Sequence, residues 1–354
     1  MPTYAVTTAQ STYQAIVERG CIAGVRDYIP KRAGKLFIAS TADVWALHGS
    51  LFADIPAELL IFPGGEPRKR LSEVEAMAER MVAAGGDRSS VIIAFGGGIL
   101  TDVAGFLAAI FMRGIPVIQI PTTLLAQVDA AIGGKTGVNL ESGKNLIGSF
   151  HQPLAVLIDP AVLDTLPERE YRAGLFEIIK HGIIASDGLF WTMRRCFDAV
   201  MLHAHGVVDY MISESVRIKA DVVSRDEKES DLRRILNFGH TFGHALEAET
   251  AYSRFLHGEA VAWGMKAAVH LSRSEGLLKE ADAGEMLACV DSYGPIPSLD
   301  GISAANLFAR LASDKKTVHG NVHFVLTEGI GRPRIVSGVA PERVMAAIEA
   351  ALAG

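Results

Sequence analysis

The stretch from Val91 to Phe106 reads VIIAFGGGILTDVAGF, and it decides the fold class. A run of apolar residues ends at three consecutive glycines, and a helical pattern begins at Thr101-Asp102. The order is therefore strand, glycine turn and helix. Such a turn lets the backbone approach a pyrophosphate, whose charge the positive end of the helix favours. A tight turn without a ligand is the alternative, and the GxGxxG fingerprint is absent.

Apolar runs surround this segment at residues 35–39, 58–62 and 116–120. Near-continuous runs of this kind predict strands that are buried on both faces of a parallel sheet. Leu71 to Ala84 carries apolar residues at helical spacing and stops at Gly85-Gly86, a typical helix end. The N-terminal half is therefore predicted to be built from βαβ units.

The character of the chain changes from about Glu168 onward, where long segments rich in Ala, Leu and Glu predominate, including 260–275 and 342–352. A short β-like stretch at 322–326 predicts a small hairpin. We therefore expect an α/β domain with a parallel sheet over residues 1–167 and a mainly α-helical domain over residues 168–354.

The composition excludes several classes of protein. The 354 residues are 49% hydrophobic and 21% charged, as in a folded α/β enzyme. The net charge of -6 gives no footprint for nucleic acid or an anionic membrane. We expect no leader, because the first residues lack a basic segment followed by an apolar run, and no segment approaches the roughly 20 apolar residues of a membrane span. Three scattered cysteines predict neither a disulfide framework nor a thiolate zinc site, so a cytoplasmic location is expected.

Cations follow the glycine turn at Arg113, Lys135 and Lys144, each next to a glycine or one residue away from one. Together they suit a phosphate-bearing substrate beside a dinucleotide. Solvated surface side chains are the alternative for any single one. Downstream, Lys219, Asp226 to Glu229 and Arg233 form a polar set that, taken alone, favours a solvated charged face.

Histidines cluster in NFGHTFGH, where His240 and His244 lie one helical turn apart. Thr241 takes the place of the glutamate in HExxH, which excludes that metalloprotease motif. His257 follows, and Glu177 lies within an apolar helical run. Two histidines and a carboxylate leave coordination positions open for catalysis. Other histidines are expected to be hydrogen-bonded structural residues: His48, His151, His203, His205, His270, His319 and His323.

Several long motifs in the right order resemble the 3-dehydroquinate synthase family. They are GGGILTDVAGF at 96–106, RGIPVIQIPTTLLAQVDAAIGGKTGV at 113–138, GKNLIG at 143–148, the helix at 175–182, and 236–265 from LNFGHTFGHALE to HGEAVAWGM. The resemblance implies a Rossmann-like domain that binds NAD, a helical domain that carries the metal, and a homodimer.

The resemblance also implies roles for individual residues. Glu177, His240 and His257 would bind a divalent metal, zinc or cobalt. The residues expected at the cofactor are Glu66, Lys69, Gly97, Gly98, Asp102, Thr122, Thr123, Asp129, Lys135 and Lys144. The residues expected at the reacting substrate are Lys135, Asn145, Lys180, Lys219, Glu229, Arg233, Asn237 and His244, with Arg113 reaching the phosphate across the dimer interface. The family usually has Asp and Asn near the adenosine ribose, where this chain has Ser40 to Val44 with Asp43.

The implied reaction converts 3-deoxy-D-arabino-heptulosonate 7-phosphate, a phosphorylated sugar acid, to 3-dehydroquinate and phosphate. It proceeds by transient oxidation with NAD, phosphate elimination, re-reduction and intramolecular aldol closure. Lys135, Lys180 and Arg113 would hold the phosphate, and His244 would transfer a proton.

Three alternatives remain at this stage. One is another sugar-phosphate cyclase, which makes an inosose or a valiolone, although Lys219 and Asp314-Lys315-Lys316 favour dehydroquinate. The second is a metal-dependent polyol dehydrogenase, which would accumulate NADH. The third is a nucleotide-sensing or scaffold protein that has the fold without the activity.

Overall fold

The computed structural model describes residues 2–9, 11–313 and 322–354. They divide into two compact units, Met1–Pro167 with Ile212–Lys228, and Glu168–Met211 with Glu229–Gly354. The sequence predicted an NAD-binding domain at 1–167 and a metal- and substrate-binding domain at 168–354, and this division stays a prediction. The two units differ from those ranges because Ile212–Lys228 belongs to the first unit. The sequence arguments from Asp314-Lys315-Lys316 and from His319 lie outside the described residues.

The first unit is built on a seven-stranded sheet in the order β1-β2-β9-β6-β5-β3-β4. β1 and β2 pair antiparallel, and the other pairings are parallel. The strands are β1 (Thr3–Thr7), β2 (Thr12–Val17), β3 (Leu36–Thr41), β4 (Ala57–Phe62), β5 (Val91–Gly96), β6 (Val117–Pro121) and β9 (Ala155–Ile158). The four apolar runs predicted as parallel strands are confirmed as β3, β4, β5 and β6.

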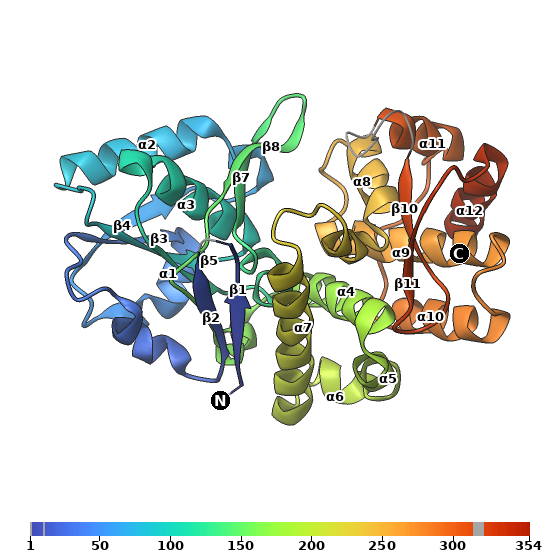
Figure 1. Cartoon of the computed structure of the whole chain (residues 1–354), viewed down its shortest axis with the longest axis horizontal. Helices are drawn as coiled ribbons and strands as arrows, with labels where there is room; N and C mark the ends of the chain where they lie inside the picture. The colour runs from blue at the N-terminus through green and yellow to red at the C-terminus, as the bar shows by residue number, and fades with distance from the viewer. Residues whose placement is uncertain (1, 10, 314–321) are drawn as a thin grey trace. The chain divides into compact units, whose positions relative to one another are not determined.

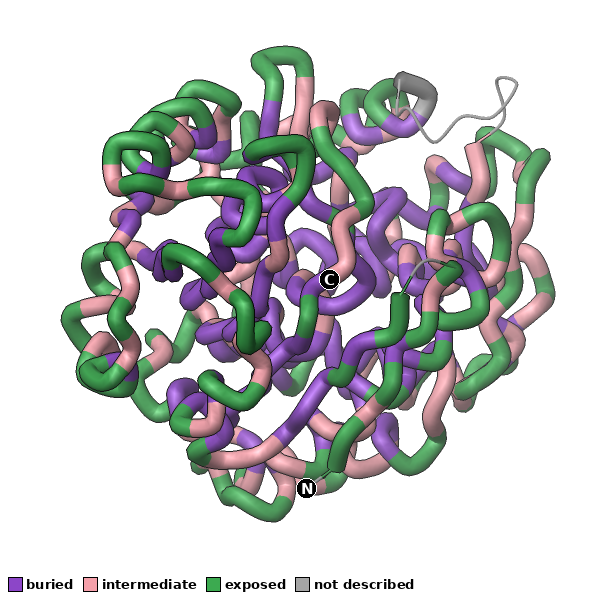
Figure 2. The backbone as a smooth tube through the Cα atoms, turned by 60° about the vertical axis from the view of Figure 1, so that its left-hand side comes forward, coloured by how far each residue is buried: buried purple, intermediate pink, exposed green. Residues whose placement is uncertain are grey.

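Strand β5 shows why those runs are apolar at every position. Its residues are all buried. Figure 2 colours the buried parts of the backbone purple. Ile92 and Ala94 face a core shared with α2 (Leu71–Ala83) and α3 (Gly98–Ile110). Ile93 and Phe95 face a second core. Helices therefore cover both faces of the sheet, with α2 and α3 together on one side (Figure 1).

Shorter elements complete the first unit. They are α1 (Ala42–His48), the 3-10 turns η1 (Cys21–Tyr28), η2 (Gly49–Phe52), η3 (Glu66–Arg68), η4 (Phe111–Arg113) and η6 (Pro160–Thr165), the π-helical turn η5 (Ala126–Ala130), and the hairpin of β7 (Lys135–Leu140) and β8 (Gly143–Phe150). Residues 212–225 of α7 (His205–Arg225) also belong here. Their Ser213 Oγ lies 2.6 Å from Tyr4 Oη in β1.

The expected start of α3 at Thr101-Asp102 is wrong, because the helix begins at Gly98 with Gly97 as its N-cap. Gly97 has φ −71° and ψ 179°, so the chain passes from strand to helix through ordinary extended backbone. Close packing explains this glycine, since a Cβ there would lie 2.9 Å from Cγ2 of Thr123. The glycines at 97 and 98 therefore bring the start of α3 close to the chain that follows β6.

The second unit is mainly helical, as predicted. Its remaining elements are α4 (Glu168–Ala185), α5 (Asp187–Arg195), α6 (Phe197–Met201), η7 (Leu232–Asn237), α8 (His240–Glu249), α9 (His257–Ser274), α10 (Glu280–Ser292), α11 (Ala304–Ser313), α12 (Pro341–Ala353) and the hairpin of β10 (His323–Thr327) and β11 (Pro333–Ser337). The predicted helices at 260–275 and 342–352 are confirmed as α9 and α12, and the hairpin is confirmed as β10 with β11.

Helix α9 organises the second unit. It contacts α4, α8, α10 and α12. Its Trp263 is buried and donates a hydrogen bond of 3.1 Å from Nε1 to the carbonyl of Ala351 in α12. Across the described residues, no helix combines the length and the apolar character that a membrane crossing requires.

Candidate functional site

Glycines bring three helices of the second unit close together. A Cβ on Gly258 in α9 would lie 1.9 Å from the carbonyl oxygen of Ala173 in α4. A Cβ on Gly264 would lie 2.0 Å from the carbonyl oxygen of Gly239, the left-handed N-cap of α8. Both obstacles are backbone atoms, so a larger residue at either position would push the helices apart. This close packing sets the spacing between the side chains that α4, α8 and α9 carry.

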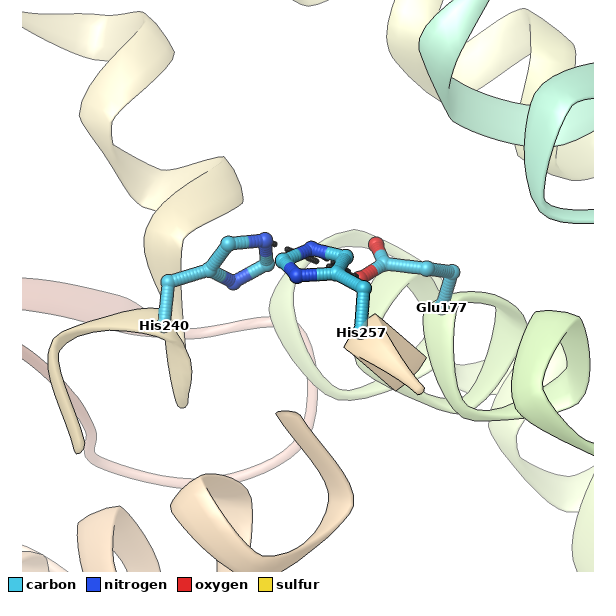
Figure 3. A group of neighbouring side chains, drawn as sticks. All are labelled: Glu177, His240 and His257. Carbon is cyan, nitrogen blue, oxygen red and sulfur yellow. Dashed lines mark ion pairs between the residues drawn. The ribbon is translucent and has the colours of Figure 1, made fainter. Parts of the chain in front are cut away.

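Those helices bring together Glu177, His240 and His257, which we call the metal cluster (Figure 3). Oε1 of Glu177 lies 3.6 Å from Nε2 of His240 and 3.9 Å from Nε2 of His257. The Glu177 side chain is 0% exposed. A buried carboxylate that points at two imidazoles needs a positive charge nearby.

The contacts of each imidazole indicate which ring nitrogen carries the proton. They also show which nitrogen turns its lone pair toward Glu177. Nδ1 of His240 lies 3.2 Å from the carbonyl of Phe238, and Nδ1 of His257 lies 3.4 Å from Oε2 of Glu247. Carbonyl and carboxylate oxygens only accept, so each neutral ring donates from Nδ1 and keeps its lone pair on Nε2.

The resulting donor set fits a divalent cation. Two Nε2 lone pairs and Oε1 of Glu177 converge, and Oε1 accepts no hydrogen bond within the described part of the chain. Imidazole nitrogen and carboxylate oxygen are the ligands of open catalytic zinc sites. That these residues bind a metal stays a prediction, and their geometry suits it.

Two further predicted residues lie beside the metal cluster. Lys180, one turn after Glu177 in α4, is buried and donates from Nζ to Oε2 of that carboxylate. A buried ammonium is tolerated only when it is paired. His244 lies one turn after His240, and its ring centroid is 5.8 Å from that of His257. Lys180 therefore supplies a fixed positive charge, and His244 supplies a group that can carry a proton.

The polar set that runs from Lys219 in α7 to Arg233 in η7 is not a solvated face, so that interpretation is wrong for its buried members: Lys219, Asp226 and Arg233. The 3-10 turn η7 carries Arg233, which is buried, and Asn237, which is partly buried. Asn237 donates from Nδ2 to Oε1 of Glu229 at 2.5 Å. Charge density in the sequence suggested solvent exposure, whereas tertiary packing buries Lys219, Asp226 and Arg233.

Lys69 and Asp102, predicted at the cofactor, and Asn145, predicted at the substrate, are linked by side-chain hydrogen bonds. Lys69, only 3% exposed, donates from Nζ to Oδ2 of Asp102 at 2.5 Å and to Oδ1 of Asn145 at 2.6 Å. Asp102 comes from the first turn and a half of α3, and Asn145 comes from β8 with a left-handed φ of 53°. Lys69 therefore ties the hairpin to the helix that follows the glycines.

Sequence reasoning missed Asn139, which extends this set into what we call the cofactor network: Glu66, Lys69, Asp102, Asn139 and Asn145. Oδ1 of Asn139 accepts from the backbone N–H of Asn145 at 2.8 Å, and Nδ2 donates to Oε1 of Glu66 at 2.7 Å. Lys144 Nζ lies 3.9 Å from the same carboxylate. The position of Asn139 between GGKTG and GKN was the available signal.

Asp102 illustrates the electrostatic cost of this network. Burial raises the pKa of its carboxyl above the ordinary value, and the Lys69 ammonium opposes part of that rise. Ionisation of this carboxyl therefore costs more in the folded protein than in water, which is common for groups that serve a ligand.

The other predicted residues of the first unit lie as follows. Asp129 in η5 accepts from Nζ of Lys219, which lies on the part of α7 that belongs to this unit. Thr122 is buried and its Oγ1 has no hydrogen-bond partner in the described residues. Lys135 and Arg113 are exposed, and Arg113 has a left-handed φ of 70°.

Thr123 and Asp43 are the two remaining residues that the sequence placed at or near the cofactor. Thr123 is partly buried and packs close to Gly97. Asp43 is exposed in the first turn of α1, directly after β3. Its contact with an adenosine ribose stays a prediction.

Glu247 is the second residue that sequence reasoning missed. It lies on α8, and its Oε2 is 3.4 Å from Nδ1 of His257. The signal was in the quoted motif HTFGHALE, because residues 240, 244 and 247 share one face of a helix.

Comparison with solved structures identifies the class of fold. A 2-epi-5-epi-valiolone synthase from Streptomyces hygroscopicus subsp. jinggangensis, with NAD+ and Zn2+ bound, is 30% identical with a TM-score of 0.89, over 98% of each chain. A 2-deoxy-scyllo-inosose synthase, complexed with carbaglucose-6-phosphate, NAD+ and Co2+, is 28% identical with a TM-score of 0.86, over 98% of this chain and 99% of that one. The chain therefore has the fold of the sugar-phosphate cyclases, which confirms the predicted fold class.

Sequence comparison then identifies the family. Family models of the 3-dehydroquinate synthase N-terminal and C-terminal regions match residues 59–173 and 174–317. A 3-dehydroquinate synthase from Solibacter usitatus is 62% identical over 357 residues, which cover 100% of both chains. The chain belongs to the 3-dehydroquinate synthase family, and the resemblance predicted from the motifs is confirmed.

Proposed function

We propose that this chain converts 3-deoxy-D-arabino-heptulosonate 7-phosphate to 3-dehydroquinate and phosphate. The observation that carries the proposal is the metal cluster, in which one buried carboxylate oxygen and two imidazoles converge in a chain of this family. The proposed reaction is that of a lyase that uses NAD and a divalent metal. The related cyclases were solved with NAD+ and with Zn2+ or Co2+.

Bound at these sites, NAD supplies reversible hydride transfer and the metal supplies a Lewis acid for hydroxyl oxygens. The cluster residues Glu177, His240 and His257 hold the metal. Lys180 holds Glu177 in place and keeps a positive charge where an anionic substrate arrives. His244 moves a proton at its imidazole.

In the first unit, the cofactor network prepares a surface for NAD. The start of α3 offers free backbone N–H groups and a positive dipole for a pyrophosphate. Gly97 and Gly98 leave that start open, and Asp102 is held by Lys69. Arg113 and Lys135 are proposed contacts for the substrate phosphate.

The experiment that tests the proposal is phosphate release from the heptulosonate 7-phosphate with NAD and Zn2+, while absorbance reports NADH. We expect phosphate and 3-dehydroquinate to form in equal amounts with no build-up of NADH. Net NADH production would instead identify a polyol dehydrogenase. Absence of all turnover by a protein loaded with metal and NAD would favour a sensor or scaffold.

A sister cyclase is the nearest competing function, and substrate choice separates the two. The inosose synthase was solved with carbaglucose-6-phosphate, so a hexose 6-phosphate is the competing substrate class. Identity of 62% to a 3-dehydroquinate synthase, against 28% and 30% to the two cyclases, favours the heptulosonate. Faster phosphate release from the hexose phosphate would contradict this choice.

We also propose a cytoplasmic homodimer. The three cysteines, Cys21, Cys196 and Cys289, are all free, which suits a reducing compartment. Arg113 is exposed next to exposed Met112 in a strained turn, where a second copy could cover both. Sedimentation velocity at several protein concentrations measures the oligomeric state, and a monomer at all of them would contradict the proposal.

A further inference from the structure

We infer that Glu247 is a positioning residue of the metal cluster, which holds the imidazole of His257 so that Nε2 faces Glu177. The inference rests on the metal binding proposed above and extends it to a residue that is not itself a ligand in that arrangement.

Helix geometry places Glu247 for this role. His240, His244 and Glu247 lie at spacings of four and three residues on α8, and therefore share one face. Glu247 is 2% exposed. A carboxylate so far from water is costly unless it meets donors, and the Nδ1–H of His257 is one of them.

The three cluster residues differ in how they are oriented. Nδ1 of His240 meets a backbone carbonyl, and the Glu177 carboxylate meets the buried Lys180. His257 is the first residue of α9 and has the most exposed side chain of the three, at 32%. Its Nδ1 meets the side chain of Glu247. Of the two imidazoles, His257 is therefore the one whose outer partner a single substitution can remove.

The physical effect of the carboxylate is twofold. It selects the tautomer in which Nε2 carries the lone pair, and its negative charge makes that lone pair a stronger donor to a cation. The Nδ1 to Oε2 distance of 3.4 Å is longer than an ordinary hydrogen bond. Loss of such an outer partner typically weakens metal binding by about 10- to 100-fold.

A competing arrangement uses the same residues differently. Ligand atoms of His244, Glu247 and His257 also lie within 4.8 Å of one another, so Glu247 could instead bind a second cation. The two arrangements predict different stoichiometries, one ion for positioning and two for a second site.

The test compares the wild type with Glu247→Gln and Glu247→Ala, each purified without metal. Glu249→Gln is the matched control, because Glu249 lies on the same helix and its carboxylate meets Asn306 and Arg310. Competition with a chromophoric chelator gives the affinity and number of Zn2+ ions. The absorption spectrum of the Co2+ form reports the ligand geometry directly.

We expect one ion in every protein. Glu247→Ala should bind it about 100-fold more weakly with an altered Co2+ spectrum. Glu247→Gln should lose about 10-fold, because its amide oxygen still accepts from Nδ1 but carries no charge. The control should match the wild type. Thermal unfolding of the metal-free proteins shows whether a variant has simply lost its fold.

Two results would overturn the inference while leaving the proposed function intact. One is a folded Glu247→Ala protein with the affinity and Co2+ spectrum of the wild type. The other is a wild type that binds two ions and a Glu247→Ala variant that binds one at full affinity. A wild type that binds no divalent ion would overturn the metal-dependent function itself.

Discussion

The metal cluster and the cofactor network hold their side chains in different ways. Glu177, His240 and His257 project from helices whose separation is fixed by backbone contacts at glycines. The cofactor network comes largely from turns and a hairpin, and its side chains hold one another. In the first region a disturbance of packing should therefore move every ligand, whereas in the second a lost hydrogen bond should loosen one loop.

Removal of a ligand should give the largest effect. We expect His257→Ala to lose the metal and to reduce kcat/KM by at least about 10³-fold, about 4 kcal/mol of transition-state stabilisation. His270→Ala, a matched change on the same helix and outside the cluster, should retain both metal and activity. Stoichiometric metal with normal turnover in His257→Ala would mean that the cluster is not the catalytic metal site.

Disturbed packing between the helices should come next. A Cβ at residue 264 would lie 2.0 Å from the carbonyl of Gly239 and 2.7 Å from the backbone nitrogen of Gly243. We expect Gly264→Ala to lower the free energy of unfolding by about 3 kcal/mol and to weaken metal binding. Urea denaturation and chelator competition measure the two effects.

Gly284→Ala on α10 is the control for this substitution, since nothing lies within 4 Å of its Cβ position. It should stabilise the helix by roughly 0.5–1 kcal/mol. If both variants behaved alike, glycine packing would not set the geometry of the cluster.

A lost hydrogen bond in the cofactor network should have a smaller and local effect. Asn139→Leu keeps the size of the side chain and removes its bonds to Glu66 and to the N–H of Asn145. We expect NAD to bind about tenfold more weakly, about 1.4 kcal/mol, with metal affinity unchanged. Titration calorimetry measures both affinities.

The control removes a similar bond elsewhere. Asn306 donates to Glu249 at 2.7 Å in the second unit, and Asn306→Leu should leave NAD affinity as it is. A fall in metal affinity in Asn139→Leu would show that the two regions are not separable.

The smallest effect concerns pH. Burial raises the pKa of Asp102 in the folded protein above the ordinary 3.8. The folded state therefore binds this proton more tightly than the unfolded state, and its contribution to stability is lost as pH rises through the folded pKa. Asp102→Asn has no such loss, so it should gain stability relative to the wild type as pH rises above about 4. Denaturation series at pH 4 and pH 7 test the sign, and the opposite trend would exclude a raised pKa.

Much of the fold could be predicted because it follows from local patterns. The apolar run at 91–95 can only be buried on both faces, and α9 shows helical periodicity over its whole length. The start of α3 was misplaced, because the glycines indicated a turn by their composition. Their actual role is close packing against Thr123, which depends on a segment farther along the chain.

The same limit applies to the site. Spacing on one helix placed His240 and His244 together. His257 and Glu177 were candidates from their residue types, and the family resemblance assigned them as ligands. Contacts between elements could not be read this way: Asn139 of β7 meets Glu66 of η3, and Arg233 is buried despite its charged neighbourhood. Asn139 and Glu247, the two residues that sequence reasoning missed, act through contacts with other elements.

The first unit is formed by two stretches of chain that are separate in sequence, and this affects how the chain folds during synthesis. Asp129 obtains its partner Lys219, and Tyr4 of β1 obtains Ser213, from a helix translated long after the sheet. An emerging chain therefore cannot finish its first unit when residue 167 leaves the ribosome. It must wait until about residue 228, by which time α4 with Glu177 has already been made. A fragment cut at residue 167 would lack the segment that completes its fold.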